Sequence, residues 1–181
     1  MPVSSSFDDP SARTEGAIKA ATQPGDALPP SVLTVDSGPW ILSGSGVFSW
    51  SVFRLYRASL FVQDSLDSGK PFALMLSYLR RVTALQIADT SSGEFARLGF
   101  GCEQDRARWH AQMIGLLPDV GLGDTLVGLF VPEQRVTFFD AGHCLGSMED
   151  PLFVKAFASI WLDPRTQGPA LRKALLGNKD G

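Results

Sequence analysis

The pattern of apolar and polar residues predicts mostly extended structure in the first part of the folded region. Residues 32–35 and 40–42 are short apolar runs on either side of the turn sequence Asp-Ser-Gly-Pro. Gly-Ser-Gly at 44–46 is typical of another turn. Residues 47–63 are rich in β-branched and aromatic residues without a helical period, so they predict one long strand. Arg54 interrupts its apolar face, which favours a bulge or bend in this strand.

The middle of the chain adds a strand and short helices. After a polar loop, residues 72–81 are predicted to form the next strand, with apolar side chains on one face. Thr83 is placed to cap a short helix, and Ser91 or Ser92 to cap a second one that ends at Gly99. The predicted order here is a strand followed by two short helices.

Hairpin and helix signals fill the second half of the chain. Asp105 begins a helix that ends before Pro118. Residues 126–131 and 136–139 are predicted to pair as an antiparallel hairpin. Asp-Pro at 150–151 is a strong signal for the start of a helix. The aspartate side chain accepts hydrogen bonds from the free N–H groups of the first turn, and proline is tolerated at the first helical position because its missing N–H would have no partner there.

The stretch F-A-S-I-W-L-D-P-R-T at 157–166 predicts the end of that helix and a linker. Trp161 is interpreted as a core residue, Pro164 ends the helix, and residues 169–176 form a last one. Strands and helices do not alternate regularly along the chain. This order predicts an α+β fold, in which a layer of helices packs on one face of a large antiparallel sheet.

Composition indicates a globular protein with one folded domain. The chain has 181 residues, 44% of them hydrophobic and 19% charged, and a formal net charge of −3. Residues 1–30 are rich in Ser, Pro, Asp and Gly and are expected to be irregular, whereas residues 31–181 form the domain. The acidic balance argues against a nucleic-acid partner. No apolar run reaches the roughly 20 residues of a transmembrane segment.

Familiar motifs for phosphates, dinucleotides and metals are absent from the sequence, so no cofactor and no metal site are predicted. The two cysteines, Cys102 and Cys144, are expected to be small buried residues, and a bridge between them is the open alternative. His143 and Cys144 are neighbours on an expected strand. Their side chains therefore point to opposite faces, which argues against a catalytic pair.

Arginine and tyrosine residues gather on two predicted strands. Arg54 and Tyr56 lie on the first, and Tyr78 and Arg80 lie on the second. A guanidinium beside a phenol on an apolar sheet face is suited to bind a carboxylate or a phenolate. These four residues, with Trp109 from the following helix, are the candidate ligand-binding residues. The alternative is that the arginines face solvent or pair with nearby acids.

Several segments carry a family pattern in one collinear order. They are G-S-G-V-F-S-W-x-x-F-x-x-Y-x-A-S-L at 44–60, F-A-L-M-L-S-Y-L-R-R-V-T-A at 72–84, E-F-A-R-L-G at 94–99, L-P-D-V-x-x-G-D-T-L at 117–126, and I-W-L-D-P-R-T at 160–166 with the L-R-K-A-L-L-G that follows. Together they resemble the bacterial chalcone isomerase-like family over about residues 40–177. The resemblance implies the chalcone isomerase fold, with a ligand cleft between a large antiparallel sheet and a layer of helices.

The resemblance does not carry the plant activity with it. Plant chalcone isomerases stabilise the attacking phenolate with an arginine in a G-V-R-G motif, and the matching position here is Phe48. Loss of one oxyanion donor weakens such a mechanism by roughly 2.7–4 kcal/mol. The plant threonine that orders a catalytic water falls on Tyr56, and Ser159 is similar to the plant Ser/Thr of the closing helix. Tyr56 and Ser159 are thus the candidate catalytic residues for a different reaction.

Three functions follow from these observations, because fold alone does not dictate function. The first is a non-catalytic protein that binds a small lipophilic, fatty-acid-like anion, since other proteins of this fold hold a fatty-acid carboxylate with an arginine and a tyrosine. The second is an isomerase or lyase with an unknown substrate. The third is a protein-interaction module with an unknown partner, which a cleft filled by Phe48, Trp50 and Trp109 favours. Bacterial relatives commonly carry an export leader, so the expected location is periplasmic if a leader was removed and otherwise cytoplasmic.

Overall fold

Six strands of the described chain form one antiparallel sheet, in which each strand pairs with its neighbour in the sequence. The computed structural model describes residues 27–177. Helices α3 and α4 are inserted between β3 and β4. The elements are α2 (Pro30–Val35), β1 (Ile41–Trp50), β2 (Phe53–Val62), the 3-10 turn η2 (Leu66–Ser68), β3 (Phe72–Tyr78), α3 (Ala84–Leu98), α4 (Glu103–Leu116), β4 (Thr125–Val131), β5 (Arg135–Asp140), β6 (Cys144–Met148), α5 (Pro151–Leu162) and α6 (Pro169–Leu175).

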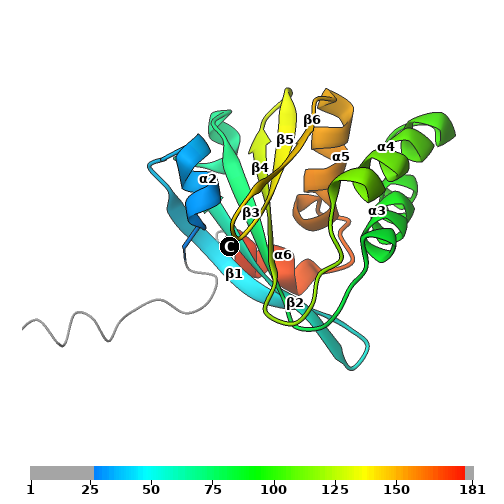
Figure 1. The fold of residues 1–181 in the computed structure, drawn as a ribbon, viewed down its shortest axis with the longest axis horizontal. Helices are drawn as coiled ribbons and strands as arrows, with labels where there is room; N and C mark the ends of the chain where they lie inside the picture. Colours follow the sequence, from blue (N-terminus) through cyan, green and yellow to red (C-terminus); the bar gives the residue numbers. More distant parts are fainter. Residues whose placement is uncertain (1–26, 178–181) are drawn as a thin grey trace, which may run out of the picture.

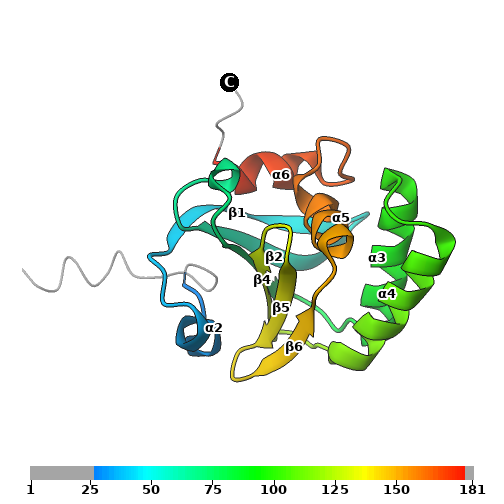
Figure 2. The same cartoon turned by 90° about the horizontal axis from the view of Figure 1, so that it is seen from above.

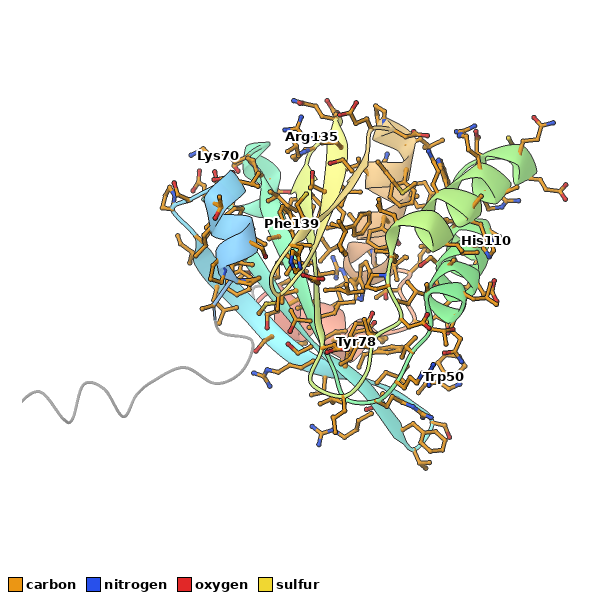
Figure 3. The ribbon with its side chains drawn as sticks, viewed as in Figure 1. Trp50, Lys70, Tyr78, His110, Arg135 and Phe139 are labelled. Atoms are coloured by element: carbon orange, nitrogen blue, oxygen red, sulfur yellow. The ribbon has the colours of Figure 1, made fainter. Side chains whose placement is uncertain are left out.

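Helices α3 to α6 cover one face of the sheet, and α2 lies against the other (Figure 1 and Figure 2). The main core is aromatic. The Phe157 ring on α5 lies with its centroid 6.0 Å from that of Phe130 and 5.4 Å from that of Phe138. A smaller cluster on the opposite face joins Val32 of α2 to Phe139, which Figure 3 shows on that side. The predicted α+β fold is confirmed, and α2 lies on the face opposite the predicted layer of helices.

The chain reverses direction at Ser51, so the long strand predicted over residues 47–63 is a hairpin of β1 and β2. Trp50 pairs with Phe53, and Ser51 adopts a left-handed φ of 56°. Two-residue hairpin turns require such backbone angles. The bend predicted from the position of Arg54 is therefore a complete turn three residues earlier.

The Gly-Ser-Gly sequence lies inside β1 and does not form the predicted turn. A side chain at Gly44 would collide with the carbonyl oxygen of Ala174 on α6, and one at Gly46 would lie 3.1 Å from Ala174 Cβ. Helix α6 thus packs directly on the backbone of β1. Glycine in a strand marks either a turn or such a close approach, and the sequence does not distinguish the two.

Residues 32–35 belong to helix α2 and not to the predicted strand. Pro30 occupies the first position, where its missing N–H does no harm, and Thr34 Oγ1 donates to the Pro30 carbonyl at 2.8 Å. A short apolar run is compatible with either a strand or a short helix. Of the segment predicted to be irregular, residues 1–26 lie outside the described range.

The two short helices predicted after β3 are one helix, α3. Thr83 caps it as predicted, since its hydroxyl accepts from the Gln86 N–H at 3.1 Å while the Gln86 side chain accepts from the Thr83 N–H at 2.9 Å. Ser91 and Phe95 are buried one turn apart and continue the helix through the predicted break. Ser92 also lies within α3, so neither serine is a cap.

Helix α4 begins at Glu103, before the predicted start, because Cys102 is its N-cap and Asp105 accepts from the Cys102 N–H at 3.1 Å. Cys102 and Cys144 are both unbridged and exposed, so the expectation that they are buried was wrong. The start of α5 is as predicted: Asp150 Oδ1 accepts from the N–H groups of the first turn at 3.0 and 3.3 Å.

Candidate functional site

A narrow apolar cavity of about 130 Å³ lies between the sheet and the helices. Strands β2 to β5 form its floor, α3 forms one wall, and the end of α5 forms another. Aliphatic and phenylalanine side chains dominate the lining. They include Leu74, Leu76, Ile87, Leu126, Phe130, Phe138 and Phe157.

Two tyrosines from neighbouring strands line the sheet side of this cavity. Tyr56 and Tyr78 are paired across β2 and β3, and their ring centroids lie 5.7 Å apart in an edge-on arrangement. The Tyr56 hydroxyl accepts a hydrogen bond from Trp161 Nε1 at 2.9 Å, so its own proton is left to donate. Phe48 stacks on Tyr56 with a centroid distance of 5.4 Å.

Both phenols are neutral at pH 7, and burial moves their ionisation to still higher pH. Burial raises the pKa of Tyr56 to about 12, with a smaller rise from the charge of Glu94, although the hydrogen bond from Trp161 acts against the rise. Burial raises the pKa of Tyr78 still further, and Tyr56 adds to that rise. At neutral pH the cavity therefore offers O–H donors and no phenolate.

A wider space of about 600 Å³, the mouth, lies beside the cavity. The two spaces share Phe48, Tyr56 and Trp161 among other lining residues, so they adjoin each other. Arg80 and Arg81 line the mouth. Charged groups are thus confined to the outer space, while the inner cavity is lined by uncharged side chains.

Among the described residues, three charged ones line the mouth, namely Arg80, Arg81 and Glu94, and they differ in how strongly other side chains of the protein bind them. The Arg80 guanidinium lies 4.8 Å from the centroid of the Phe53 ring. The Arg81 Nη2 atom lies 3.9 Å from a carboxylate oxygen of Asp119, and both side chains are more than half exposed, so this pair is weak. The Glu94 carboxylate forms an ion pair with Arg97, whose Nη2 atom lies 2.6 Å from Oε2, and accepts a hydrogen bond from the Gln167 side-chain amide. The arginines at the rim are available for an incoming anion.

The Asp-Pro-Arg-Thr corner after Trp161 fixes the α5–α6 side of the mouth. Asp163 accepts hydrogen bonds from the Arg165 side chain, which, with the Arg165 backbone N–H, lower the pKa of Asp163 to about 2. Thr166 Oγ1 donates to the Ile160 carbonyl at 2.6 Å. The corner therefore holds Trp161 and Ile160, which both line the cavity.

A sequence model described as chalcone isomerase-like matches residues 21–177. The chain belongs to the chalcone isomerase-like family. A comparison with curated proteins gave no match. Among solved structures, the fold is similar to that of a fatty-acid binding protein from Arabidopsis thaliana, with a TM-score of 0.62 and 10% sequence identity over 88% of this chain and 94% of that one.

In this chalcone isomerase-like protein, three of the predicted site residues come together. Tyr56 and Tyr78 line the inner cavity, and Arg80 lines its mouth. Phe48, where the sequence resemblance led us to expect the position of the plant arginine, lines both spaces and brings no charge to them. The residue types therefore form a gradient, from apolar inside through the phenols to the arginines at the rim.

Three other candidates lie elsewhere. Arg54 is exposed and lines neither space, because the reversal at the hairpin places it beside the turn. Trp109 is fully buried in the core, where its Nε1 atom donates to Asp150 at 2.9 Å. Ser159 donates to the Lys155 carbonyl one turn back on α5, and it lines neither the cavity nor its mouth.

Sequence reasoning missed the wall that α3 contributes. Gln86 and Thr90 line both the cavity and its mouth, and Ser91 lines the cavity. Together with Ile87, these residues recur at helical spacing and so lie on one face of a single helix. The sequence predicted two short helices in place of α3, and this face was therefore not recognised.

Proposed function

We propose that this chalcone isomerase-like protein binds a small lipophilic ligand with an anionic head group, such as a fatty acid, without catalysing a reaction on it. The observation that carries the proposal is the order of chemistry across two adjoining spaces. An uncharged, mostly apolar cavity leads past Tyr56 to a mouth lined by Arg80 and Arg81.

An amphiphilic ligand matches this order. Each buried methylene group contributes about 0.8 kcal/mol, and a carboxylate at the mouth can accept paired N–H groups from a guanidinium. The inner cavity of about 130 Å³ accommodates the end of a chain or one ring. The remainder of a longer chain would lie in the mouth, which has a volume of about 600 Å³.

The similarity to the Arabidopsis fatty-acid binding protein supports the proposal at the level of the fold. The lining supports it at the level of chemistry. The phenols have pKa values far from neutral, so they are poorly suited to proton transfer at pH 7. A volume of about 130 Å³ remains beside Phe48, while Trp50 is 59% exposed and Trp109 lies in the core, which disfavours the interaction module that a filled cleft would favour.

The first experiment is native mass spectrometry of the purified protein, followed by denaturing extraction and titration with fatty acids of increasing length. We expect a lipophilic anion at stoichiometric amounts or fatty-acid binding in the micromolar range. If nothing is extracted and no fatty acid binds below millimolar concentration, the proposal is wrong.

Two variants localise the binding. Arg80→Gln removes a charge at the mouth and is expected to weaken fatty-acid binding about tenfold or more, because a hydrogen bond to a charged group is lost. Ser91→Phe places a ring into the inner cavity and is expected to weaken binding of long chains at least as much. Arg135→Gln, at an exposed position at the other end of the sheet, is the matched control (Figure 3). Equal affinities in all three variants would exclude this site.

A further inference from the structure

The tip of the β1–β2 hairpin exposes a set of large apolar side chains. Trp50 is 59% exposed, Val52 84% and Phe53 55%. They surround the turn at Ser51, and Figure 3 shows Trp50 at the projecting end of the hairpin. Exposing several large apolar side chains next to one another in water is unfavourable. Clusters of this kind therefore mark surfaces that contact a membrane, a ligand or another protein.

Further apolar side chains are exposed at the same end of the molecule. Leu79 follows β3, and its N–H donates to the Leu55 carbonyl on the hairpin at 2.9 Å. Leu122 is 77% exposed in the loop whose Gly123 N–H bonds to the Tyr78 carbonyl at 2.9 Å. The first contact places Leu79 beside the hairpin, and the second places the Leu122 loop beside the end of β3, one strand further from the tip.

The hairpin is also basic, although the whole chain has a net charge of −3. Residues 37–63 contain no Asp or Glu and two arginines, of which Arg54 is exposed next to the tip. Arg80 lies against the Phe53 ring. The nearby carboxylate of Asp119 accepts from the Ala84 N–H at 2.8 Å, which fixes it in its own loop.

The tip adjoins the cavity mouth. Trp50 and Phe53 belong to both, and Arg80, whose guanidinium lies over the Phe53 ring, also lines this outer space. A molecule entering or leaving the mouth passes along these residues.

We propose that the hairpin tip inserts into the surface of an anionic bilayer and turns the cavity mouth toward the lipid. Trp and Phe side chains next to arginines match the chemistry of the membrane interface, where aromatic rings lie at the headgroup level and basic side chains contact anionic headgroups. Charge complementarity selects an anionic surface over a neutral one. This interaction is separate from the binding of a ligand in the cavity.

The test is flotation of the full chain with vesicles of phosphatidylglycerol and phosphatidylcholine, compared with vesicles of phosphatidylcholine alone and without added fatty acid. Binding to the anionic vesicles, reduced by high salt, is expected. Brominated lipids in the bilayer should quench the emission of Trp50, measured as the difference between the chain and its Trp50→Phe variant. Absence of binding to the anionic vesicles overturns the proposal and leaves the tip to a protein partner.

Two substitutions at the tip lie outside both cavity spaces, so they separate docking from ligand binding. Arg54→Gln is expected to lower vesicle partitioning about fivefold, and Val52→Asp to lower it about tenfold or more by introducing a charge at the inserted surface. Fatty-acid titration without vesicles should be unchanged in both. Ile41→Asp, at a 55% exposed position at the start of β1, and Arg135→Gln are the matched controls. If the tip variants bind vesicles as well as the controls do, the hairpin is not the docking element.

Discussion

Tyr56 and Tyr78 are the two tyrosines of the whole chain, so a spectroscopic signal from tyrosine reports on the cavity wall. Burial raises the pKa of Tyr56 to about 12 and raises the pKa of Tyr78 as well. An unfolded tyrosine ionises near pH 10, at about its unperturbed pKa. Above that pH the unfolded chain loses protons that the folded chain retains. The stability that the buried phenols contribute is complete below about pH 10 and is lost as the pH rises toward 12.

We therefore predict a delayed phenolate signal in alkaline titration. The absorbance change of phenolate should be absent from the folded protein at about pH 10. It should appear only as the pH approaches about 12 or together with the loss of the circular dichroism signal. In guanidinium chloride both tyrosines should titrate near pH 10. A phenolate signal at that pH from the still-folded chain would show that the phenols are not buried as described.

At the scale of single residues, the sequence indicated the chemistry of the site better than its positions. Tyr56, Tyr78 and Arg80 stand out because a phenol or a guanidinium is conspicuous in an apolar strand. Arg54 stands out for the same reason, yet the hairpin turn places it outside the cavity. Trp109 was chosen as a large aromatic side chain of the following helix, and it is buried in the core instead. The type of a side chain can be read from the sequence. Whether that side chain lines the cavity depends on how elements distant in the sequence pack together.

At the scale of elements, two glycines of different surroundings should respond oppositely to alanine. Gly44→Ala is expected to destabilise the fold by about 1–3 kcal/mol, because its Cβ meets the backbone of α6, which has no freedom to move aside. Gly93→Ala lies inside α3 with open space around it and should stabilise by about 0.5–1 kcal/mol. Urea unfolding of the two variants measures both effects. Similar free energies of unfolding would mean that α6 does not rest on β1.

Element boundaries could be predicted where a local signal fixes them. The capping carboxylate of Asp150 and the Pro151 that follows placed the start of α5, and the cap at Thr83 placed the start of α3. Where the signal is a glycine or a serine, as at Gly44 and Ser91, the local pattern is compatible with both a boundary and a continuation. Whether an element ends or continues at such a position depends on packing against residues far away in the sequence. The local sequence carries no information about that packing.

At the scale of the whole molecule, carboxylates with lowered pKa values stand at junctions between elements. Hydrogen bonds from Arg165 hold the pKa of Asp163 at about 2 between α5 and α6. Burial raises the pKa of Asp150, but hydrogen bonds from Trp109, Phe153 and Arg108 outweigh burial and lower it overall. Such groups contribute stability that is present above the unfolded pKa near 4 and is lost as the pH falls through the folded pKa.

The free energy of unfolding should therefore decrease steeply between about pH 4 and pH 2. In Asp163→Asn this decrease should be shallower, because the variant has no carboxylate to protonate at that corner. Asp150→Ala should lose about 2 kcal/mol at pH 7 through the missing cap and the unpaired Trp109 Nε1 atom. Thermal unfolding at several pH values measures these changes, with Asp67→Asn at an exposed position of η2 as the control. A pH dependence identical to that of the unaltered chain in Asp163→Asn would contradict this account.

The order of the strands has a consequence for protein synthesis. Neighbouring strands pair with each other, so much of the sheet can form while the chain is still emerging from the ribosome. The cavity wall, by contrast, draws on residues from Phe48 to Trp161. A nascent chain that lacks α5 has a sheet but no closed pocket above it. A ligand of this pocket would therefore bind only after α5 has been synthesised and packed, and it could not assist the early steps of folding.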